Sequence, residues 1–559
     1  MLTSILDENR SATRRSAGGQ EAIKAGPLAG MTLQHNIVLI DDKVSPTAFR
    51  FARRFNAAVP FIDRHLKEGR AGKLAIRSPF QDVSYATLAE RVAQCGNALR
   101  RSGVSPRARL LMIVKDCPDF FYLFWGCIKA GIVPVPLSTD LRVDDYKYLI
   151  EDSRCAAVVY SSECAREVEA ASAQAAHRPR HMLVVEPDHH SSMITIMADV
   201  PATLAAAPTS ADDDCFWLYS SGSTDRPKGI VHRHRDMVIT SQLYGVDVLG
   251  IASDDICFSA AKLFFAYGLG NAMTFPLWAG ATAVLLPDRA TAQSTFAIIE
   301  RFKPTVYFGL PTLYAAQIRS LESSAPDFSS IRLCVSAGEA LPLSIFQRWH
   351  ELTGKVILEG IGSTEVLHIY ITNRMTDFKP GTNGRVVPGY SAKIVNHKGR
   401  PVRRGERGQL RVQGESIAKR YWNNPRRTRE IIREGWLNTG DIFFQDADGY
   451  YVYQGRTDDM LKVSGSWCSP FEIEAVLNEH PSVLEAAVVG RADADGLIKP
   501  EAWIVPNQKR VDPAKIEREI VLYCKTKLAP HEYPRWFQFV PALPKTGTGK
   551  VQRFKLRAG

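Results

Sequence analysis

Short apolar runs alternate with segments of helical spacing over much of this chain, and this alternation constrains the fold more than any other feature. The run 110–114 is followed by a helical segment at 119–130 and a second apolar run at 132–137. Further apolar runs occupy 156–160, 181–186, 281–287, 305–310 and 332–338. Because strands joined by helices form parallel sheets covered by helices, the alternation predicts an α/β fold.

One helix is especially well marked, over 87–99. Its apolar residues fall on one stripe at helical spacing: Leu88, Val92, Cys95 and Leu99. Thr87 and Glu90 have the spacing of a capping box, which predicts that the helix begins at Thr87. Gly103 is expected to follow the end of this helix.

The sequence pattern changes near Ala392 and again near Gly455. Short strands and glycine-containing turns over 392–412 indicate a small β subdomain. After Gly455, a helix at 470–478 is followed by strands and a second helix, as in an α+β unit of about 100 residues. A chain of 559 residues exceeds what one hydrophobic core holds. The predicted parts are a flexible leader at 1–35, a large domain at 36–455 and a smaller C-terminal domain at 456–559.

Composition excludes several classes of protein. Apolar residues make up 45% and charged residues 23%, which is ordinary for a globular chain and excludes a disordered or fibrous one. Lys and Arg number 70 against 59 Asp and Glu, a net charge of +11. The excess concentrates only at the C-terminal end, in Lys545, Lys550, Arg553, Lys555 and Arg557. Without a nucleic-acid recognition motif, this cluster favours a small anionic ligand and no nucleic acid.

A membrane location is not expected. Residues 263–287 carry no charge and are long enough to cross a bilayer, but glycines, Asn271 and Pro276 interrupt them, so buried strand, loop and helix pieces are predicted. Residues 1–31 have no apolar signal core. The ten cysteines form no C-x-x-C pair, which favours a reducing cytoplasm.

The stretch 219–229, "YSSGSTDRPKG", has the composition of a phosphate-binding loop. It is not a Walker A motif, because its lysine precedes Gly229 and no hydroxyl residue follows it. Hydroxyls, glycine backbone and one cation nevertheless suit phosphate oxygens. The candidate ligands are Ser220, Ser221, Gly222, Ser223, Thr224 and Lys228. A serine-rich surface turn is the alternative.

This loop resembles the phosphate loop of the adenylate-forming superfamily of acyl-CoA synthetases, luciferases and adenylation domains. Further motifs follow in that family's order: "GIGSTE" at 360–365, "NTGD" at 438–441, "GRTDD" at 455–459, "KVSG" at 462–465 and "PKTGTGK" at 544–550. The resemblance covers about residues 38–557. Spaced matches of this kind are far more specific than a single motif.

The resemblance implies roles for individual residues. Thr364 would contact the α-phosphate and Glu365 would hold Mg²⁺, a cation that prefers carboxylate and phosphate oxygen. Asp441, in a tight turn, would accept the ribose hydroxyls, and Arg456 would meet ribose or phosphate. Taken alone, these residues also suit a helix N-cap, a turn aspartate and a solvated charge cluster.

The C-terminal motifs carry the family's two-step chemistry. The small domain is mobile in that family, and Asp458 matches the hinge about which it rotates. Lys550 would bridge the carboxylate and the α-phosphate in the first half-reaction. Lys462 is a further candidate cofactor-binding residue, and Gly465 belongs to the opposite face, where it would let the pantetheine thiol of coenzyme A approach. A flexible surface lysine is the alternative for Lys550.

The substrate clue is "KLFFAYGLGN" at 262–271, which contains no acid to pair with an amino-acid ammonium. Together with "SAGEALP" at 336–342 and "EVLHIYITN" at 365–373, it resembles the benzoate-CoA ligase branch. That resemblance places five residues around an aryl carboxylate: Ala266, Tyr267, Gly362, His368 and Ile369. Core packing is the alternative for the aromatics, and a structural role for His368.

The expected activity is that of an ATP-dependent aryl-acid:CoA ligase, most simply for benzoate, using ATP, Mg²⁺ and coenzyme A in the cytoplasm. A hydroxybenzoate or aminobenzoate ligase, an enzyme loading a carrier protein, and a non-catalytic nucleotide-binding homologue remain alternatives, and a monomer or a homodimer is equally compatible. Asp225 departs from the family, which usually has glycine there. It predicts a weaker ATP affinity or an outward-turned carboxylate, with Arg226 offsetting part of its charge.

Overall fold

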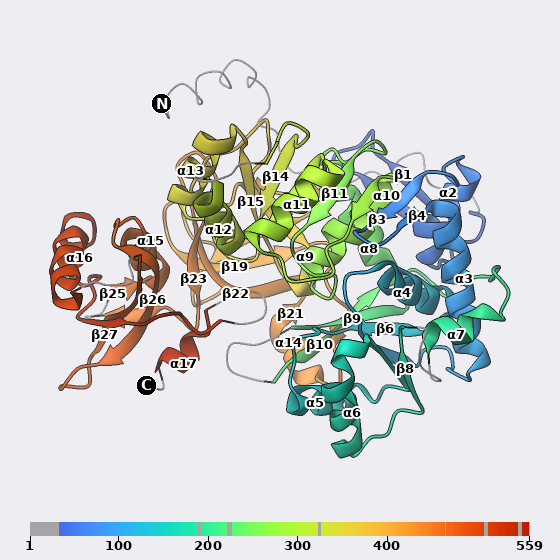
Figure 1. Cartoon of the computed structure of the whole chain (residues 1–559). Helices are drawn as coiled ribbons and strands as arrows, with labels where there is room; N and C mark the ends of the chain where they lie inside the picture. The colour runs from blue at the N-terminus through green and yellow to red at the C-terminus, as the bar shows by residue number, and fades with distance from the viewer. Residues whose placement is uncertain are drawn as a thin grey trace.

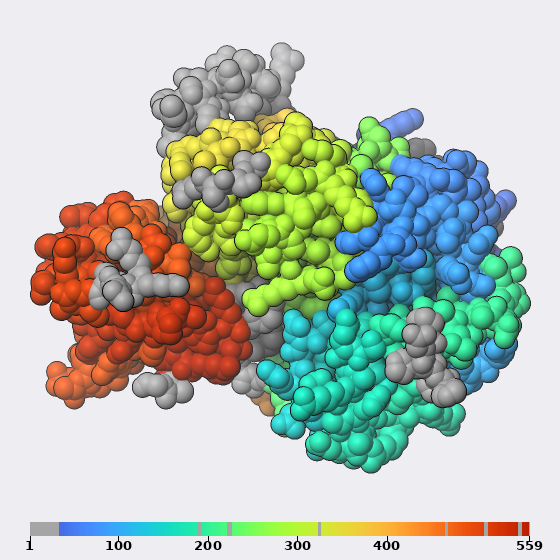
Figure 2. Space-filling model, viewed as in Figure 1, coloured from blue at the N-terminus to red at the C-terminus, as the bar shows by residue number. Residues whose placement is uncertain are grey.

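The computed structural model describes residues 33–186, 192–220, 226–321, 326–463, 466–507, 512–545 and 551–557. The chain forms a large α/β body followed by a smaller α+β lobe (Figure 1). Almost all of the predicted leader, residues 1–32, lies outside the described ranges. In the space-filling view, the red C-terminal lobe lies beside the green and yellow part of the large body (Figure 2).

The first sheet has four parallel strands in the order β6-β5-β7-β8. They are β5 (Arg109–Ile113), β6 (Val133–Pro136), β7 (Ala157–Tyr160) and β8 (His181–Val184). The helices between them are α4 (Pro118–Ala130), α5 (Val143–Ser153) and α6 (Ala165–Gln174). The parallel α/β arrangement predicted from alternation is confirmed here.

The second sheet has nine strands in the order β17-β16-β15-β14-β13-β11-β12-β3-β4. Its six central strands are parallel: β15 (Ile357–Gly362), β14 (Leu333–Ser336), β13 (Val306–Gly309), β11 (Ile256–Ser259), β12 (Thr282–Val284) and β3 (Leu74–Arg77). Antiparallel strands close both edges: β16 (Ile369–Thr372) and β17 (Arg385–Val386) at one, β4 (Asp82–Ser84) at the other. Helices α11 (Ala292–Phe302), α12 (Pro311–Leu321) and α13 (Leu343–Thr353) separate its strands in the chain.

Two antiparallel sheets complete the large body. Strand β10 (Lys228–Arg233) pairs with β9 (Asp214–Ser220) on one side and β20 (Arg420–Tyr421) on the other. The five-stranded sheet contains β18 (Ser391–Val395), β19 (Gly408–Gln413), β21 (Ile432–Arg433), β22 (Trp436–Gln445) and β23 (Tyr451–Arg456). The small β subdomain expected over 392–412 is therefore present.

The C-terminal lobe packs two helices and a three-stranded sheet around its main apolar core, and a smaller apolar cluster contains Leu556 of the last helix. Its elements are β24 (Leu461–Val463), β25 (Ser466–Cys468), α15 (Pro470–Asn478), β26 (Val483–Ala492), β27 (Ile498–Pro506), α16 (Pro513–Lys527), β28 (Trp536–Phe539) and α17 (Arg553–Arg557). The lobe contacts the large body where Arg407 donates to both carboxylate oxygens of Glu472, at 2.8 and 3.0 Å. The helix predicted at 470–478 is confirmed.

The predicted capping box at Thr87 and Glu90 is wrong. Helix α3 (Tyr85–Arg101) begins earlier, because the hydroxyl of Ser84 accepts the backbone N–H of Thr87 at 3.1 Å and acts as the N-cap. The end is as expected, since Gly103 has a φ of +83° just beyond the helix.

The uncharged stretch 263–287 folds into short pieces: α9 (Ala266–Leu269), the π-helix η4 (Gly270–Thr274), α10 (Phe275–Ala279) and β12. Among the described residues, no helix has the length and apolarity needed to cross a bilayer. All ten cysteines lie in the described ranges as free thiols, nine of them buried.

Candidate active site

Two of the motif segments lie at the carboxyl ends of parallel strands in the nine-stranded sheet. Residues 262–271 follow the carboxyl end of β11, and Thr364 and Glu365 follow the carboxyl end of β15. Ligands of open α/β sheets bind beyond the carboxyl ends of parallel strands. A substrate site is therefore expected at these carboxyl ends.

The candidate phosphate loop connects β9 to β10. Ser220 and Lys228, at its two ends, are cross-strand partners, so the antiparallel pair keeps the two ends of the loop close together. Ser221, Gly222, Ser223, Thr224 and Asp225 lie outside the described residues. The guanidinium of Arg226 lies over the ring of Tyr148, 5.0 Å from its centroid, and the Tyr148 hydroxyl donates to the Pro227 carbonyl at 3.0 Å.

Glu365 contacts the strands that carry this loop. It lies in a 3₁₀ turn, Thr364–Val366, and its Oε1 accepts the hydroxyl of Tyr421 at 2.7 Å. Tyr421 belongs to β20, which pairs directly with β10, and the ring nitrogen Nε2 of His232 in β10 donates to the carbonyl of Thr364 at 2.8 Å. The "GSTE" motif is thus in contact with the hairpin that carries the candidate phosphate loop, a contact that no sequence spacing indicated.

Asp441 and Arg456 form an ion pair across neighbouring strands. The Nη1 of Arg456 donates to Oδ1 of Asp441 at 3.0 Å and to the carbonyl of Thr439 at 3.0 Å. The "NTGD" motif is not the tight turn that was predicted; it is a bulge inside strand β22, with Gly440 at a φ of +74°. Asp441 is buried and Arg456 is exposed, and the charge of Glu365 helps to raise the pKa of Arg456, so Glu365 lies near this pair.

A buried tyrosine lies among these three motifs. Burial raises the pKa of Tyr370 well above its ordinary value, and the charges of Asp441 and Glu365 raise it further while Arg456 lowers it. Asp441, Glu365 and Arg456 therefore all act on one hydroxyl, which has no hydrogen-bond partner in the described part of the chain. Sequence reasoning missed Tyr370.

Near Asp458, the predicted hinge residue, the ion pairs are formed by the neighbouring aspartate. Asp458 is exposed, whereas the carboxylate of Asp459 pairs with Arg557 at 2.7 Å and with Arg553 at 3.8 Å. Lys462 lies exposed in β24. Gly465 and Lys550 lie outside the described residues.

The residues proposed to hold an aryl acid come together from distant parts of the chain. Ala266 and Tyr267 begin α9, whereas Ile369 begins β16 and is the cross-strand partner of Gly362. The Nε2 of His368 lies 3.3 Å from the carbonyl of Tyr267. The rings of these two residues lie 5.7 Å apart, and Phe275 and Tyr244 pack on His368 at 4.5 and 5.3 Å.

His368 is an uncharged part of an apolar wall. Burial lowers its pKa to about 3, so the ring is neutral near pH 7. Glycines allow its close packing: a Cβ atom at Gly270 would lie 2.4 Å from His368 Cδ2, and one at Gly362 would lie 2.6 Å from the His368 carbonyl oxygen. Gly362 was among the predicted residues, but Gly270 was missed.

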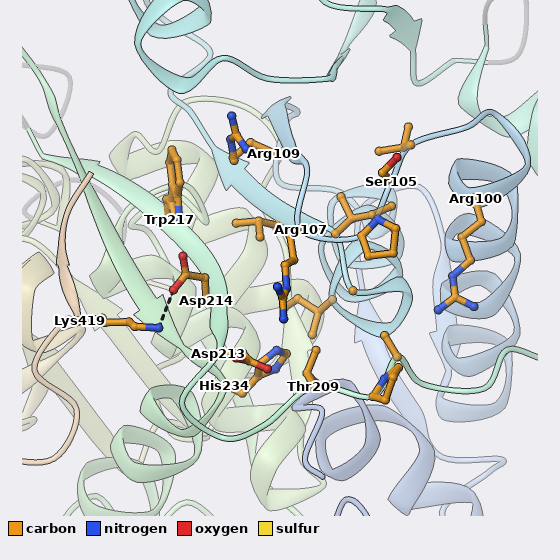
Figure 3. Close-up of a pocket in the computed structure, with 18 of the residues that line it drawn as sticks. Arg100, Ser105, Arg107, Arg109, Thr209, Asp213, Asp214, Trp217, His234 and Lys419 are labelled. Atoms are coloured by element: carbon orange, nitrogen blue, oxygen red, sulfur yellow. Dashed lines mark hydrogen bonds and ion pairs between the residues drawn. The ribbon is translucent and has the colours of Figure 1, made fainter. Parts of the chain in front are cut away.

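A separate cavity of about 860 Å³ lies at the other end of β9 from the candidate phosphate loop. Figure 3 shows the Arg107 side chain pointing toward Asp213 and His234. The acidic wall residue Asp214 is paired with Lys419 at 3.0 Å, and His234 Nδ1 accepts the backbone N–H of Ala57 at 3.1 Å. None of the predicted site residues lines this cavity, and no motif indicated it.

The chain belongs to the AMP-binding enzyme family: the model of the AMP-binding enzyme matches residues 63–422, and that of the AMP-binding enzyme C-terminal domain matches residues 472–550. It is 43% identical to the benzoate–CoA ligase of Thauera aromatica, over 94% of this chain and 100% of that protein. It is 45% identical to the 4-hydroxybenzoate–CoA/benzoate–CoA ligase of Rhodopseudomonas palustris, over 90% and 94%.

Solved structures agree in fold. A benzoate CoA ligase from Burkholderia xenovorans LB400 superposes with a TM-score of 0.83 at 42% identity, covering 90% of this chain and 100% of that one. The anthranilate CoA ligase AuaEII in complex with anthranoyl-AMP has a TM-score of 0.87 at 39% identity, covering 91% and 98%. The predicted fold class and superfamily are therefore confirmed.

Proposed function

We propose that this protein is an ATP-dependent aryl-acid:CoA ligase that accepts benzoate as its acid. The observation that carries the proposal is the pairing of Tyr267 with a buried, neutral His368, in a chain 43% and 45% identical to two ligases named for benzoate. Aromatic faces and a neutral imidazole suit a benzene ring, and residues 262–271 offer no carboxylate for an amino-acid ammonium.

The reaction has two steps. A carboxylate oxygen of the acid attacks the α-phosphorus of ATP, and the bond from this phosphorus to the oxygen that bridges to the β-phosphate breaks. Diphosphate departs, and the product is a mixed anhydride, the acyl adenylate. The thiolate of coenzyme A then attacks the carbonyl carbon, and AMP leaves as the thioester forms. Neither step requires a covalent bond to the protein.

The nucleotide roles rest on charge and on position. Asp441 is proposed to accept the ribose hydroxyls, because its carboxylate matches the aspartate of the "NTGD" motif and pairs with Arg456 at 3.0 Å. Arg456 carries a permanent charge on the same strand pair and is proposed to meet ribose or phosphate oxygen. Ser220 and Lys228 flank the loop proposed to hold the β- and γ-phosphates, with Thr364 at the α-phosphate.

Glu365 suits a magnesium ligand. Its Oε1 accepts one hydrogen bond from Tyr421, and its other carboxylate oxygen makes none to a described residue. No group of three or more His, Cys, Asp or Glu residues able to hold a metal occurs in the described ranges, so phosphate and water oxygens would complete the coordination. When bound, Mg²⁺ would offset phosphate charge during transfer.

The C-terminal residues are assigned on the resemblance. We propose a domain boundary at 455/456, a rotation about Asp458, Lys550 acting in adenylate formation, Lys462 in cofactor binding, and Gly465 on the face used with coenzyme A. Lys550→Ala is expected to slow adenylate formation at least about a hundredfold while leaving thioester formation from supplied benzoyl adenylate nearly intact. Equal losses in both steps would contradict the assignment.

The alternative of a hydroxybenzoate ligase is favoured by one observation, the 45% identity to a protein named for both 4-hydroxybenzoate and benzoate. Measuring AMP release with a panel of benzoate, hydroxybenzoates and aminobenzoates, each with and without coenzyme A, ranks the acids. A cytoplasmic location is proposed from the ten free thiols.

A further inference from the structure

Asn271 is buried, and its side-chain amide makes no hydrogen bond to any described residue. The residue has 0% exposure, and neither Oδ1 nor Nδ2 has a partner. It lies in η4, a π-helical turn between α9 and α10, directly after the glycine against which His368 packs. Single π-helical turns occur frequently at functional sites.

A buried amide without partners opposes folding, because it gives up its hydrogen bonds to water and gains none. Leucine is close to asparagine in size and would avoid this cost. The fold around Asn271 therefore offers no reason for an amide at this position. Residues that weaken folding yet are present at a site are typical of positions that serve a ligand.

The surroundings of Asn271 are those of the proposed acid site. Burial raises the pKa of Tyr267 well above its ordinary value, Tyr244 raises it further and the amide of Asn271 lowers it, although the amide lies outside hydrogen-bond geometry. The Tyr267 hydroxyl makes only a long hydrogen bond, 3.4 Å, to the carbonyl of Gly309. Its hydrogen-bonding capacity is thus weakly used.

Two further polar atoms beside this ring cluster lack partners in the described residues: the hydroxyl of Tyr244 and Nδ1 of His368. The rings that carry them lie 5.3 Å apart. Burial raises the pKa of Tyr244, and Thr372 lowers it. Thr372 nevertheless forms no hydrogen bond with the Tyr244 hydroxyl. An aromatic wall that serves only an unsubstituted ring needs none of these polar groups.

We infer that Asn271 is a specificity-determining residue that hydrogen-bonds a hydroxyl or amino group on the ring of the aryl acid. The inference rests on the proposed function and names the substrate class more narrowly. An amide offers both a donor and an acceptor, so it matches either substituent in either polarity. Benzoate leaves the amide unpaired, whereas a hydroxybenzoate or aminobenzoate satisfies it.

Substitution by a residue of similar size tests the inference. We expect the native protein to use at least one acid among 2-, 3- and 4-hydroxybenzoate and 2-aminobenzoate with a kcat/KM no lower than that for benzoate. In Asn271→Leu, kcat/KM for that acid should fall at least about tenfold relative to kcat/KM for benzoate. Equal changes for both acids, or a native protein that uses benzoate alone, would overturn the inference.

Thermal stability separates this role from a structural one. Asn271→Leu is expected to keep or raise Tm, because no hydrogen bond is lost. The matched control is Gln317→Met, another fully buried amide, whose Nε2 donates to Thr295 at 2.8 Å and to Tyr307 at 2.9 Å; its Tm should fall, with the preference among acids unchanged. A fall in Tm for Asn271→Leu as large as that of Gln317→Met would count against the inference. Absence of AMP release with every acid, benzoate included, would instead refute the proposed function and the inference with it.

Discussion

Gly270 lies against the imidazole of His368 so closely that a single added carbon would collide with the ring. The Cβ of an alanine at this position would lie 2.4 Å from His368 Cδ2 and 2.6 Å from Nε2. The φ of Gly270 is −62°, an ordinary helical value, so the glycine is required by packing and not by backbone conformation. The orientation of His368 thus depends on a residue almost a hundred positions earlier in the chain.

Gly270→Ala is therefore expected to displace His368 and to disturb the proposed acid site. Overpacking of this kind costs about 1–3 kcal/mol of stability, and a displaced site residue lowers kcat/KM for benzoate at least about tenfold. Steady-state kinetics and thermal unfolding measure the two effects. Gly72→Ala is the control, because its Cβ would meet no atom within 4 Å. Unchanged kinetics in Gly270→Ala would show that His368 has no part in acid binding.

Asp441→Asn should remove nucleotide affinity with little loss of stability. The side chain of Arg456 is 45% exposed and asparagine keeps an acceptor oxygen for it, so losing the ion pair is expected to cost about 1 kcal/mol. We expect KM for ATP to rise at least about tenfold and the increase in Tm on adding MgATP to disappear. Asp327→Asn breaks an exposed pair with Lys303, near the amino ends of the parallel strands, and should leave both measurements unchanged. A normal MgATP shift in Asp441→Asn would refute the ribose role.

Stability is expected to fall from mildly acidic to basic pH because of Glu359. This carboxyl is buried in β15, and burial raises its pKa to about 8, although Leu341 N–H and Asn383 donate to its Oε1 at 3.0 and 2.9 Å. A folded-state pKa above the unfolded value means that the stabilisation is complete below about pH 4.5 and is lost as pH rises through about 8.

Glu359→Gln tests this pH dependence, because glutamine keeps the acceptor oxygen and cannot ionise. The variant should match the native protein near pH 5 and exceed it in Tm near pH 9. Unfolding followed at both pH values measures the difference. Parallel pH profiles for the two proteins would mean that Glu359 does not titrate as described.

The end of the chain should stabilise the C-terminal lobe through Arg553. Its Nη2 donates to both carboxylate oxygens of Glu474, at 2.9 and 2.7 Å, and Glu474 is buried in α15. Arg553→Ala leaves that carboxylate buried without its cation, which costs about 3 kcal/mol. Proteolysis of the lobe at low protease concentration should accelerate accordingly. Glu474→Gln added to Arg553→Ala should recover part of the loss, and purely additive effects would contradict the coupling.

Local pattern was sufficient to predict much of the fold. The apolar runs at 110–114, 305–310 and 332–338 became parallel strands, because short apolar runs between helices are typical of buried parallel sheets. The cap of α3 was mispredicted because Ser84 lies outside the apolar stripe that defined the helix. No sequence pattern predicted the antiparallel strands β16 and β17, which follow the "GSTE" motif in the chain.

The order of the motifs predicted contacts between residues better than the chemistry of single residues did. Tyr267 and His368 were both predicted, and the structure brings them together. Tyr421, which bonds Glu365, and Tyr370 were missed because contacts between distant segments leave no periodic pattern. Asn271 was noticed only as one interruption of an apolar stretch, since its unpaired amide becomes evident only when its neighbours are known.

The central claim is tested most directly by incubating the protein with benzoate, MgATP and coenzyme A and identifying the products by mass spectrometry. The account predicts benzoyl-CoA, AMP and diphosphate in equal amounts, with no thioester when ATP or coenzyme A is omitted. Formation of ADP in place of AMP, or no thioester from benzoate or any ring-substituted benzoate, would contradict it.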